Sequence, residues 1–175
     1  MVCLPAKGST SPGAIWRHRQ RLQSLRTGGT IGTHVESVRT APMSYHFDFD
    51  STHRILRCRF EGRVTDEELE EYYLAAGRYV ALTDATFGIT DCSGVESFDV
   101  SPKTIRELAN LPPIMTEQSS IRCVVAPSDK VFGLARMFEL QGEGTRADFH
   151  VVRTMKEALA ILGVQAPKFD PINTS

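Results

Sequence analysis

The chain has 175 residues, of which 41% are hydrophobic, and its formal net charge is −1. This length and composition suffice for one domain with a hydrophobic core, and the near-zero charge argues against nucleic acid or an acidic membrane as a general partner. No apolar run approaches the roughly 18 residues that span a bilayer, and no secretory signal is recognisable. We therefore expect a cytoplasmic domain without a membrane span.

The four cysteines, Cys3, Cys58, Cys92 and Cys123, are far apart in the sequence. No two of them have the close spacing of zinc ligands. The last three lie in stretches that we expect to be buried strands, where a free thiol behaves as a small hydrophobic side chain. We therefore predict structural thiols in a reducing compartment, and neither a metal nor a cofactor.

Residues 1–42 differ in composition from the rest of the chain. They contain six basic residues and one acidic residue, whereas the remainder has a formal charge of −6. The segment is rich in Ser, Thr and Gly and has no sustained periodicity, which is typical of a disordered arm. Three interpretations stay open: a translated upstream region with Met43 as the true start, a functional basic tail, or an organelle transit peptide.

Two alternating stretches open the predicted domain, which spans residues 43–163. Residues 45–50 and 56–61 alternate between apolar and polar side chains, as half-buried strands do. The linker 51–54 is short, so we expect an antiparallel hairpin. Its outer face places two aspartates opposite two arginines, and we interpret it as a solvated face. These residues are Asp48, Asp50, Arg57 and Arg59.

Four helices are predicted from their caps and from apolar residues at helical spacing. Thr65 and Thr154 each precede a glutamate by three residues, which is the capping-box pattern. Ser101 stands directly before a proline, the usual opening of a helix, and another helix begins at Ser128 or Asp129. The aromatic residues on these helices are either core or ligand contacts, and they are Tyr72, Tyr73, Tyr79, Phe132 and Phe138.

Three further stretches, 87–92, 121–126 and 149–153, are predicted as buried strands. The element order β-β-α-β-α-β-α-β-α indicates an α/β fold with a mainly parallel five-stranded sheet and one antiparallel edge strand, the first. Residues 164–175 contain two prolines and no period, so we expect a flexible tail. One core should bury most of Phe60, Leu69, Tyr73, Val124, Leu134, Phe138, Val151 and Leu159.

Ligands of parallel sheets gather beyond the carboxyl ends of the strands. The segments expected at this edge are 62–65, 91–101 and 127–129, with Thr154, and the candidate regulatory or binding residues are Asp91, Ser93, Asp99, Ser101 and Ser128. The helix N-termini there could hold an anion or a phosphorylated side chain, but each hydroxyl residue taken singly is better explained as a cap. Asp91 and Asp99 could alternatively form a carboxylate pair for a metal.

No catalytic constellation stands out. The five histidines form no HExxH pair, and neither a G-x-S-x-G elbow nor a phosphate-binding G-x-x-x-x-G-K-[ST] loop is present. The glycines in 141–146 (QGEGTR) follow a helix and precede a strand, the reverse of a nucleotide fingerprint. We therefore expect a binding domain and keep a small enzyme as the alternative.

Three stretches together resemble the STAS domain of the SpoIIAA-like family, the fold of the bacterial anti-sigma factor antagonists. Residues 91–101 (DCSGVESFDVS) resemble that family's strand and the D-S-S-G loop that opens a helix. Residues 131–142 (VFGLARMFELQG) resemble its third helix, and residues 149–162 (FHVVRTMKEALAIL) its last strand and helix. The resemblance covers residues 45–163.

The resemblance implies a regulatory or protein-interaction module with a protein partner. Family members are switched when a kinase phosphorylates a serine at the start of the second helix, and the motif match places Ser101 there. Val100 and Pro102 stand where the family has serine and glycine. Divergent members also resemble the lipid-binding SEC14 type of domain, so the alternative is a carrier of a small apolar or anionic ligand.

Overall fold

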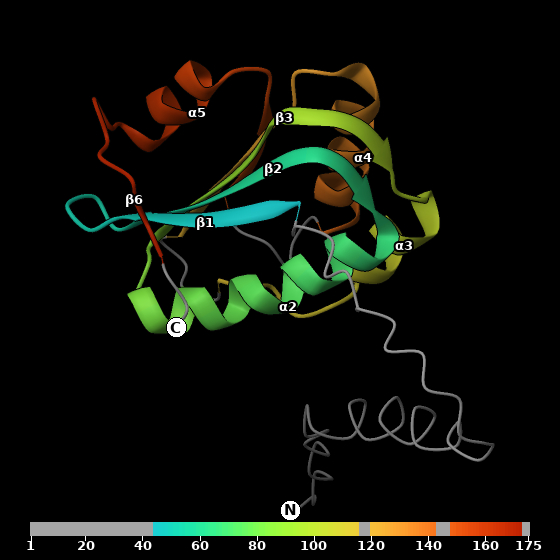
Figure 1. Ribbon diagram of the computed structural model, residues 1–175, viewed down its shortest axis with the longest axis horizontal. Coiled ribbons are helices and arrows are strands. Elements are labelled where there is room, and N and C mark those ends of the chain that lie inside the picture. The colour runs from blue at the N-terminus through green and yellow to red at the C-terminus, as the bar shows by residue number, and fades with distance from the viewer. Residues whose placement is uncertain (1–43, 116–119, 143–147, 173–175) are drawn as a thin grey trace, which may run out of the picture. The chain divides into compact units, whose positions relative to one another are not determined.

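The computed structural model describes residues 44–115, 120–142 and 148–172, so the arm expected at 1–42 lies outside it. The described residues form a six-stranded sheet in the order β5-β4-β3-β2-β1-β6 (Figure 1). The strands are β1 (Tyr45–Asp50), β2 (Ile55–Thr65), β3 (Phe87–Asp99), β4 (Ile121–Val125), β5 (Phe149–Val152) and β6 (Asp170–Pro171), and the helices are α2 (Asp66–Thr83), α3 (Pro102–Ala109), α4 (Asp129–Gln141) and α5 (Met155–Leu162).

The predicted α/β fold is confirmed, because β2, β3, β4 and β5 pair in parallel and helices alternate with them. β1 pairs with β2 in the predicted antiparallel hairpin, from Tyr45 opposite Phe60 to Asp50 opposite Ile55. The expected strand count was one too low, and β1 is not the edge. Residues 170–171, in the segment expected to be a flexible tail, form β6 and pair antiparallel with β1.

The two central strands are longer than the sequence indicated. Residues 62–65 and 93–99, expected as loops at the carboxyl edge, continue β2 and β3 and remain paired up to Thr65 and Asp99. Their register shifts where Gly94 lies, and a Cβ on this glycine would be 2.9 Å from the carbonyl oxygen of Phe60. Glycine therefore permits the close approach that a β-bulge requires.

All four predicted helix caps are present. Thr65 and Thr154 form the predicted capping boxes with the glutamates three residues further on. Ser101 Oγ accepts a hydrogen bond from Thr104 N at 3.2 Å, and Ser128 Oγ accepts one from Val131 N at 3.4 Å. These caps fix where each helix leaves the sheet.

The interior consists of two cores, one on each face of the sheet, and not the single core expected. Helices α2, α3 and α4 pack on one face, and α5 covers β3, β4 and β5 on the other (Figure 1). Of the eight predicted core residues, Phe60 and Tyr73 are buried and the other six are half-buried. Leu159 belongs with α5 and the second core; six of the others, all but Tyr73, pack in or against the first core.

The outer face of the β1–β2 hairpin is covered, so its interpretation as a solvated face was wrong. Asp48 is 2% exposed and accepts hydrogen bonds from Arg57 Nη2 and Arg59 Nε, each at 2.8 Å. The Arg57 guanidinium lies 3.9 Å from the ring centroid of Phe169. The segment 168–172 therefore covers this face, which the hairpin alone would leave in water.

Asp50 holds this C-terminal segment against the hairpin. Its carboxylate is 1% exposed and accepts hydrogen bonds from Lys168 N at 2.7 Å, His53 N at 2.9 Å and His53 Nδ1 at 3.1 Å. Burial alone would raise the pKa of Asp50, but these hydrogen bonds outweigh it and hold the pKa below its usual range. One side chain therefore ties the hairpin turn to the segment that precedes the last strand.

The lowered pKa of Asp50 predicts a loss of stability in acid. Its contribution is present above the unfolded-state pKa of about 3.9 and disappears as the pH falls through the folded-state pKa. We expect Asp50→Asn to lower the free energy of unfolding by about 1–3 kcal/mol near neutral pH and to flatten its decline below about pH 4. Urea unfolding across pH tests both. The control is Asp170→Asn, whose side chain is 69% exposed; equal acid profiles for both variants would contradict the assignment.

Candidate functional site

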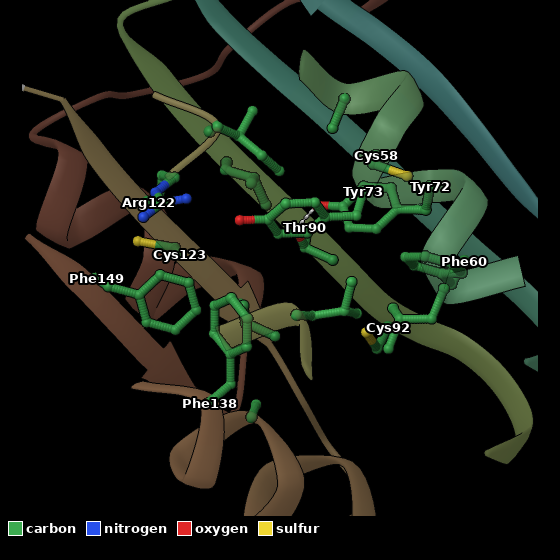
Figure 2. Close-up of a pocket in the computed structure, with 18 of the residues that line it drawn as sticks. Cys58, Phe60, Tyr72, Tyr73, Thr90, Cys92, Arg122, Cys123, Phe138 and Phe149 are labelled. Atoms are coloured by element: carbon green, nitrogen blue, oxygen red, sulfur yellow. Dashed lines mark hydrogen bonds between the residues drawn. The ribbon is translucent and has the colours of Figure 1, made fainter. Parts of the chain in front are cut away.

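An apolar cavity of about 130 Å³ lies between the sheet and helices α2, α3 and α4 (Figure 2). Every strand from β1 to β5 contributes to its lining, together with all three helices. The alternation of side chains along each strand explains the position, because the cavity lies on the face that bears Leu56, Cys58 and Phe60. The strand pattern in the sequence therefore builds its floor.

The floor is uneven because the side chains of β3 are small. Gly88 is paired with Leu56 on one side and with Arg122 on the other. A Cβ on Gly88 would be 3.3 Å from Arg122 Cγ and 3.3 Å from Met115 Sδ, so the missing side chain lets both neighbours lie over the β3 backbone. Thr90, two residues further along the same face, is also short. The middle strand thus leaves space that the helices do not fill.

Aromatic rings form much of the wall. The rings of Phe138 on α4 and Phe149 on β5 are 5.4 Å apart between centroids. Tyr72 on α2 packs edge-on against Phe60, with 5.0 Å between centroids. Figure 2 shows Phe138 and Phe149 on one side of the cavity, and Phe60 on the other. The cavity is therefore framed by rings from both layers of the fold.

Few polar groups reach the lining. The hydroxyls of Tyr72 and Thr90 are 2.6 Å apart and share a hydrogen bond. The Tyr73 hydroxyl donates to the carbonyl oxygen of Pro112 at 2.9 Å, and the Arg122 guanidinium lies 5.3 Å from the Phe149 ring centroid. Burial raises the pKa of Tyr72, so its phenol stays protonated. No carboxylate is among the described residues that line the cavity.

The three described cysteines are buried free thiols, as predicted, and Cys3 lies outside the described residues. Burial raises the pKa of Cys58, and burial with the nearby Asp91 raises the pKa of Cys92 to about 12. Burial also raises the pKa of Cys123 to about 11; its Sγ lies 4.0 Å from the carbonyl oxygen of Ala158, beneath α5. These thiols stay protonated and act as apolar groups.

The five candidate residues of the carboxyl edge do not all come together. Asp91 and Asp99 lie on the same strand, separated by up to about 26 Å of extended chain at roughly 3.3 Å per residue. Ser93 N donates to Asp91 Oδ1 at 3.0 Å, which places Ser93 beside Asp91 and away from Ser101. The expected proximity of Asp91 to Ser101 was therefore wrong, because residues 91–99 form a strand and not a loop.

Asp99 and Ser101 do lie near the start of α4. Asp99 Oδ2 accepts a hydrogen bond from Arg63 Nε at 2.8 Å, and its Oδ1 is 4.0 Å from Lys130 Nζ. These pairs are exposed, so each contributes little to stability. Ser128 is exposed and caps α4 beside them. At this edge the structure thus gathers ion pairs and helix caps.

Ser101 also joins the starts of two helices. Its backbone N–H donates to Asp66 Oδ1 in the first turn of α2 at 2.7 Å, while its hydroxyl caps α3. The hydrogen bond from Ser101 N is the main cause of the lowered pKa of Asp66. A negative group added to Ser101 would therefore stand beside a carboxylate that stays charged.

Sequence reasoning found only part of the cavity. It named Tyr72, Tyr73 and Phe138 as core or ligand contacts, and all three line the cavity, whereas Tyr79 and Phe132 do not. It missed Thr90 and Arg122, although both stand on the inner face of strands that were predicted. A polar residue at an inward position of a buried strand was the available signal.

A second opening is a groove of about 700 Å³ along β1, β6 and α2. Its walls combine the rings of Tyr45 and Tyr79 with the ion pair of Arg59 and Asp48. This mixture offers no continuous apolar surface. The cavity beneath α2 is therefore the better-defined candidate site.

Among residues 44–115, 120–142 and 148–172, no three His, Cys, Asp or Glu side chains come together to hold a metal ion. In the same part of the chain, no helix has the length and apolar character needed to cross a membrane. Comparison of the chain with protein families, with curated proteins and with solved structures finds no match. The site must therefore be interpreted from its own chemistry.

The cap role of Ser101 predicts the cost of removing its hydroxyl. Ser101→Ala loses the bond to Thr104 N but keeps the backbone bond to Asp66, so we expect the free energy of unfolding to fall by about 0.5–2 kcal/mol. Urea unfolding measures the change. Ser93→Ala, which removes an exposed hydroxyl on β3, is the control and should change stability much less. No effect of Ser101→Ala would contradict the cap role.

Proposed function

We propose that this domain binds a small apolar molecule in the cavity between the sheet and helices α2, α3 and α4, and that it acts as a carrier or receptor for that molecule. The observation that supports this function best is the lining of the cavity, which is continuous across five strands and three helices and almost entirely apolar. Binding sites for small molecules combine such a lining with a few placed polar groups.

The size of the cavity limits the ligand. Drug-sized ligands occupy pockets of about 300–1,000 Å³, whereas an apolar cavity of about 150 Å³ lined by Leu, Ile and Phe is known to bind benzene. At about 130 Å³, this cavity suits a molecule of one six-membered ring. A fitting ligand would remove the apolar side chains of the lining from water, which favours binding.

The element order supports placing this domain near the STAS type of the SpoIIAA-like family, where divergent members resemble SEC14-like ligand carriers. Its hairpin entry and the alternation of strands and helices match the order expected from that resemblance. β6 is an addition to that order. The cavity agrees better with the ligand carriers in this resemblance than with the regulatory proteins that are switched by phosphorylation.

A protein-interaction switch at Ser101 is the second candidate, and the observation in its favour is the link between Ser101 N and Asp66. This hydrogen bond links the starts of α2 and α3 at one residue of the carboxyl edge. Both helices line the cavity. A phosphate at Ser101 would stand beside Asp66 and near Asp99. A protein docked on this edge would then meet added negative charge.

Filling the cavity should abolish ligand binding. Ala135 on α4 lines the cavity, and Ala135→Leu adds three carbons there without disfavouring the helix. We expect this variant of the full-length chain to bind toluene at least about tenfold more weakly than wild type, since a filled cavity leaves no room. Methyl chemical shifts followed during a toluene titration give both affinities.

The matched control is Ala81→Leu, the same substitution at an exposed position of α2, which should bind toluene as wild type does. If toluene binds neither the wild-type chain nor the control, the proposed function is contradicted. Equal binding by all three proteins places the toluene elsewhere and contradicts it as well.

The switch candidate has its own test. Aspartate is a good N-cap, so Ser101→Asp should change the free energy of unfolding by less than about 1 kcal/mol while it adds charge at the edge. Proteins retained from a cell lysate by wild type, Ser101→Ala and Ser101→Asp are compared. A protein lost only with Ser101→Asp supports the switch, and an identical set for all three contradicts it.

A further inference from the structure

The two hydroxyls in the cavity wall carry one proton more than their hydrogen bond uses. Tyr72 Oη and Thr90 Oγ1 lie 2.6 Å apart, and either atom can donate to the other. Each hydroxyl has one proton, so whichever donates, the proton of its partner remains. No acceptor for it is found among the described residues. The pair therefore presents one donor that the protein does not satisfy.

This donor lies in the lining of an almost entirely apolar cavity, at a part-buried position. Tyr72 and Thr90 both belong to the lining, Tyr72 from α2 and Thr90 from the cavity face of β3 (Figure 2). A donor from which a ligand excludes water is costly unless the ligand provides an acceptor for it. An acceptor supplied by a ligand would remove that cost.

Other polar groups of the lining are already engaged. The Tyr73 hydroxyl donates to the carbonyl oxygen of Pro112, and the Arg122 guanidinium packs against the ring of Phe149 at the wall. A cationic ligand would lose its hydration here without meeting a carboxylate among the described lining residues. The hydroxyl pair is therefore the group that can bind a polar atom of a ligand.

Building on the proposed function, we propose that the ligand is a molecule of one ring that carries a single hydrogen-bond acceptor, a carbonyl or a carboxylate, and that the Tyr72–Thr90 pair binds this acceptor. The ring occupies the apolar part of the cavity between Phe60 and Phe138. The pair orients the ligand and selects for the acceptor, because only an acceptor satisfies the remaining proton. A hydrocarbon of the same shape fits the cavity but leaves that proton unpaired.

Isosteric probes separate shape from hydrogen bonding. Styrene and benzaldehyde have nearly the same shape, but only benzaldehyde carries an acceptor; benzoate carries a charged acceptor, and benzylamine a cationic donor. We expect the wild-type full-length chain to bind benzaldehyde about tenfold more tightly than styrene and to bind benzylamine least. Comparing the affinities for benzoate and benzaldehyde shows whether the natural acceptor is a carboxylate or a carbonyl.

The decisive variant is the double substitution Tyr72→Phe with Thr90→Val. Either single substitution leaves one hydroxyl with a free proton, whereas the double one removes both and keeps the volume, which is nearly neutral for folding. The double variant should then bind benzaldehyde and styrene about equally, with its affinity for styrene unchanged from wild type. The matched control is Tyr73→Phe, because that hydroxyl already donates to Pro112 O; it should keep the preference.

The outcomes distinguish this inference from the proposed function. Equal binding of styrene and benzaldehyde by wild type overturns the acceptor inference and leaves the apolar site standing. A preference for benzaldehyde that survives the double substitution also overturns it, as does benzylamine binding as tightly as benzaldehyde. Failure of every probe to bind wild type, with toluene included, overturns the proposed function and this inference together.

Discussion

The alternation of side chains along β2, β3, β4 and β5 determines where the other parts of this fold lie. Neighbouring side chains of a strand point to opposite faces, and the register of the parallel pairs aligns the inner residues of all four strands. One set meets α2, α3 and α4, and the other meets α5. A shift of one residue in any strand would exchange the two sets.

The cavity follows from the same constraint. Three helices cover a face whose central strand carries the small residues Gly88, Thr90 and Cys92 in the cavity lining, and larger residues on either side keep the helices at a distance. The space that remains is apolar because it lies between two hydrophobic layers. At its wall the hydroxyl of Thr90 on β3 meets the hydroxyl of Tyr72 from the opposite layer.

The opposite face shows how a short segment can complete a sheet. The hairpin of β1 and β2 carries Asp48 and Asp50 on its outer face, and isolated carboxylates are costly to bury. Arginines satisfy the first, and His53 with the backbone of Lys168 satisfies the second. The C-terminal segment can therefore cover this face, and β6 shields part of the edge of β1.

Local patterns in the sequence determined the elements of this protein. Caps, capping boxes and period-two alternation depend on neighbouring residues alone, so Thr65, Ser101, Ser128 and Thr154 were correctly placed at helix starts. Alternation of strands and helices likewise determined the α/β fold and the parallel sheet. The buried thiols Cys58, Cys92 and Cys123 also followed from their position in apolar strands.

Only the tertiary structure decided what depends on distant residues. The burial of Asp50 requires a contact with Lys168, 118 residues away, and nothing near either residue indicates it. The extension of β3 to Asp99 requires the pairing with β2, which separated Asp91 from Ser101. The cavity arises where eight elements meet, and its hydroxyl pair joins residues 18 apart in sequence through the packing of α2 on the sheet. Sequence patterns report which way a side chain faces, but only packing determines what it meets there.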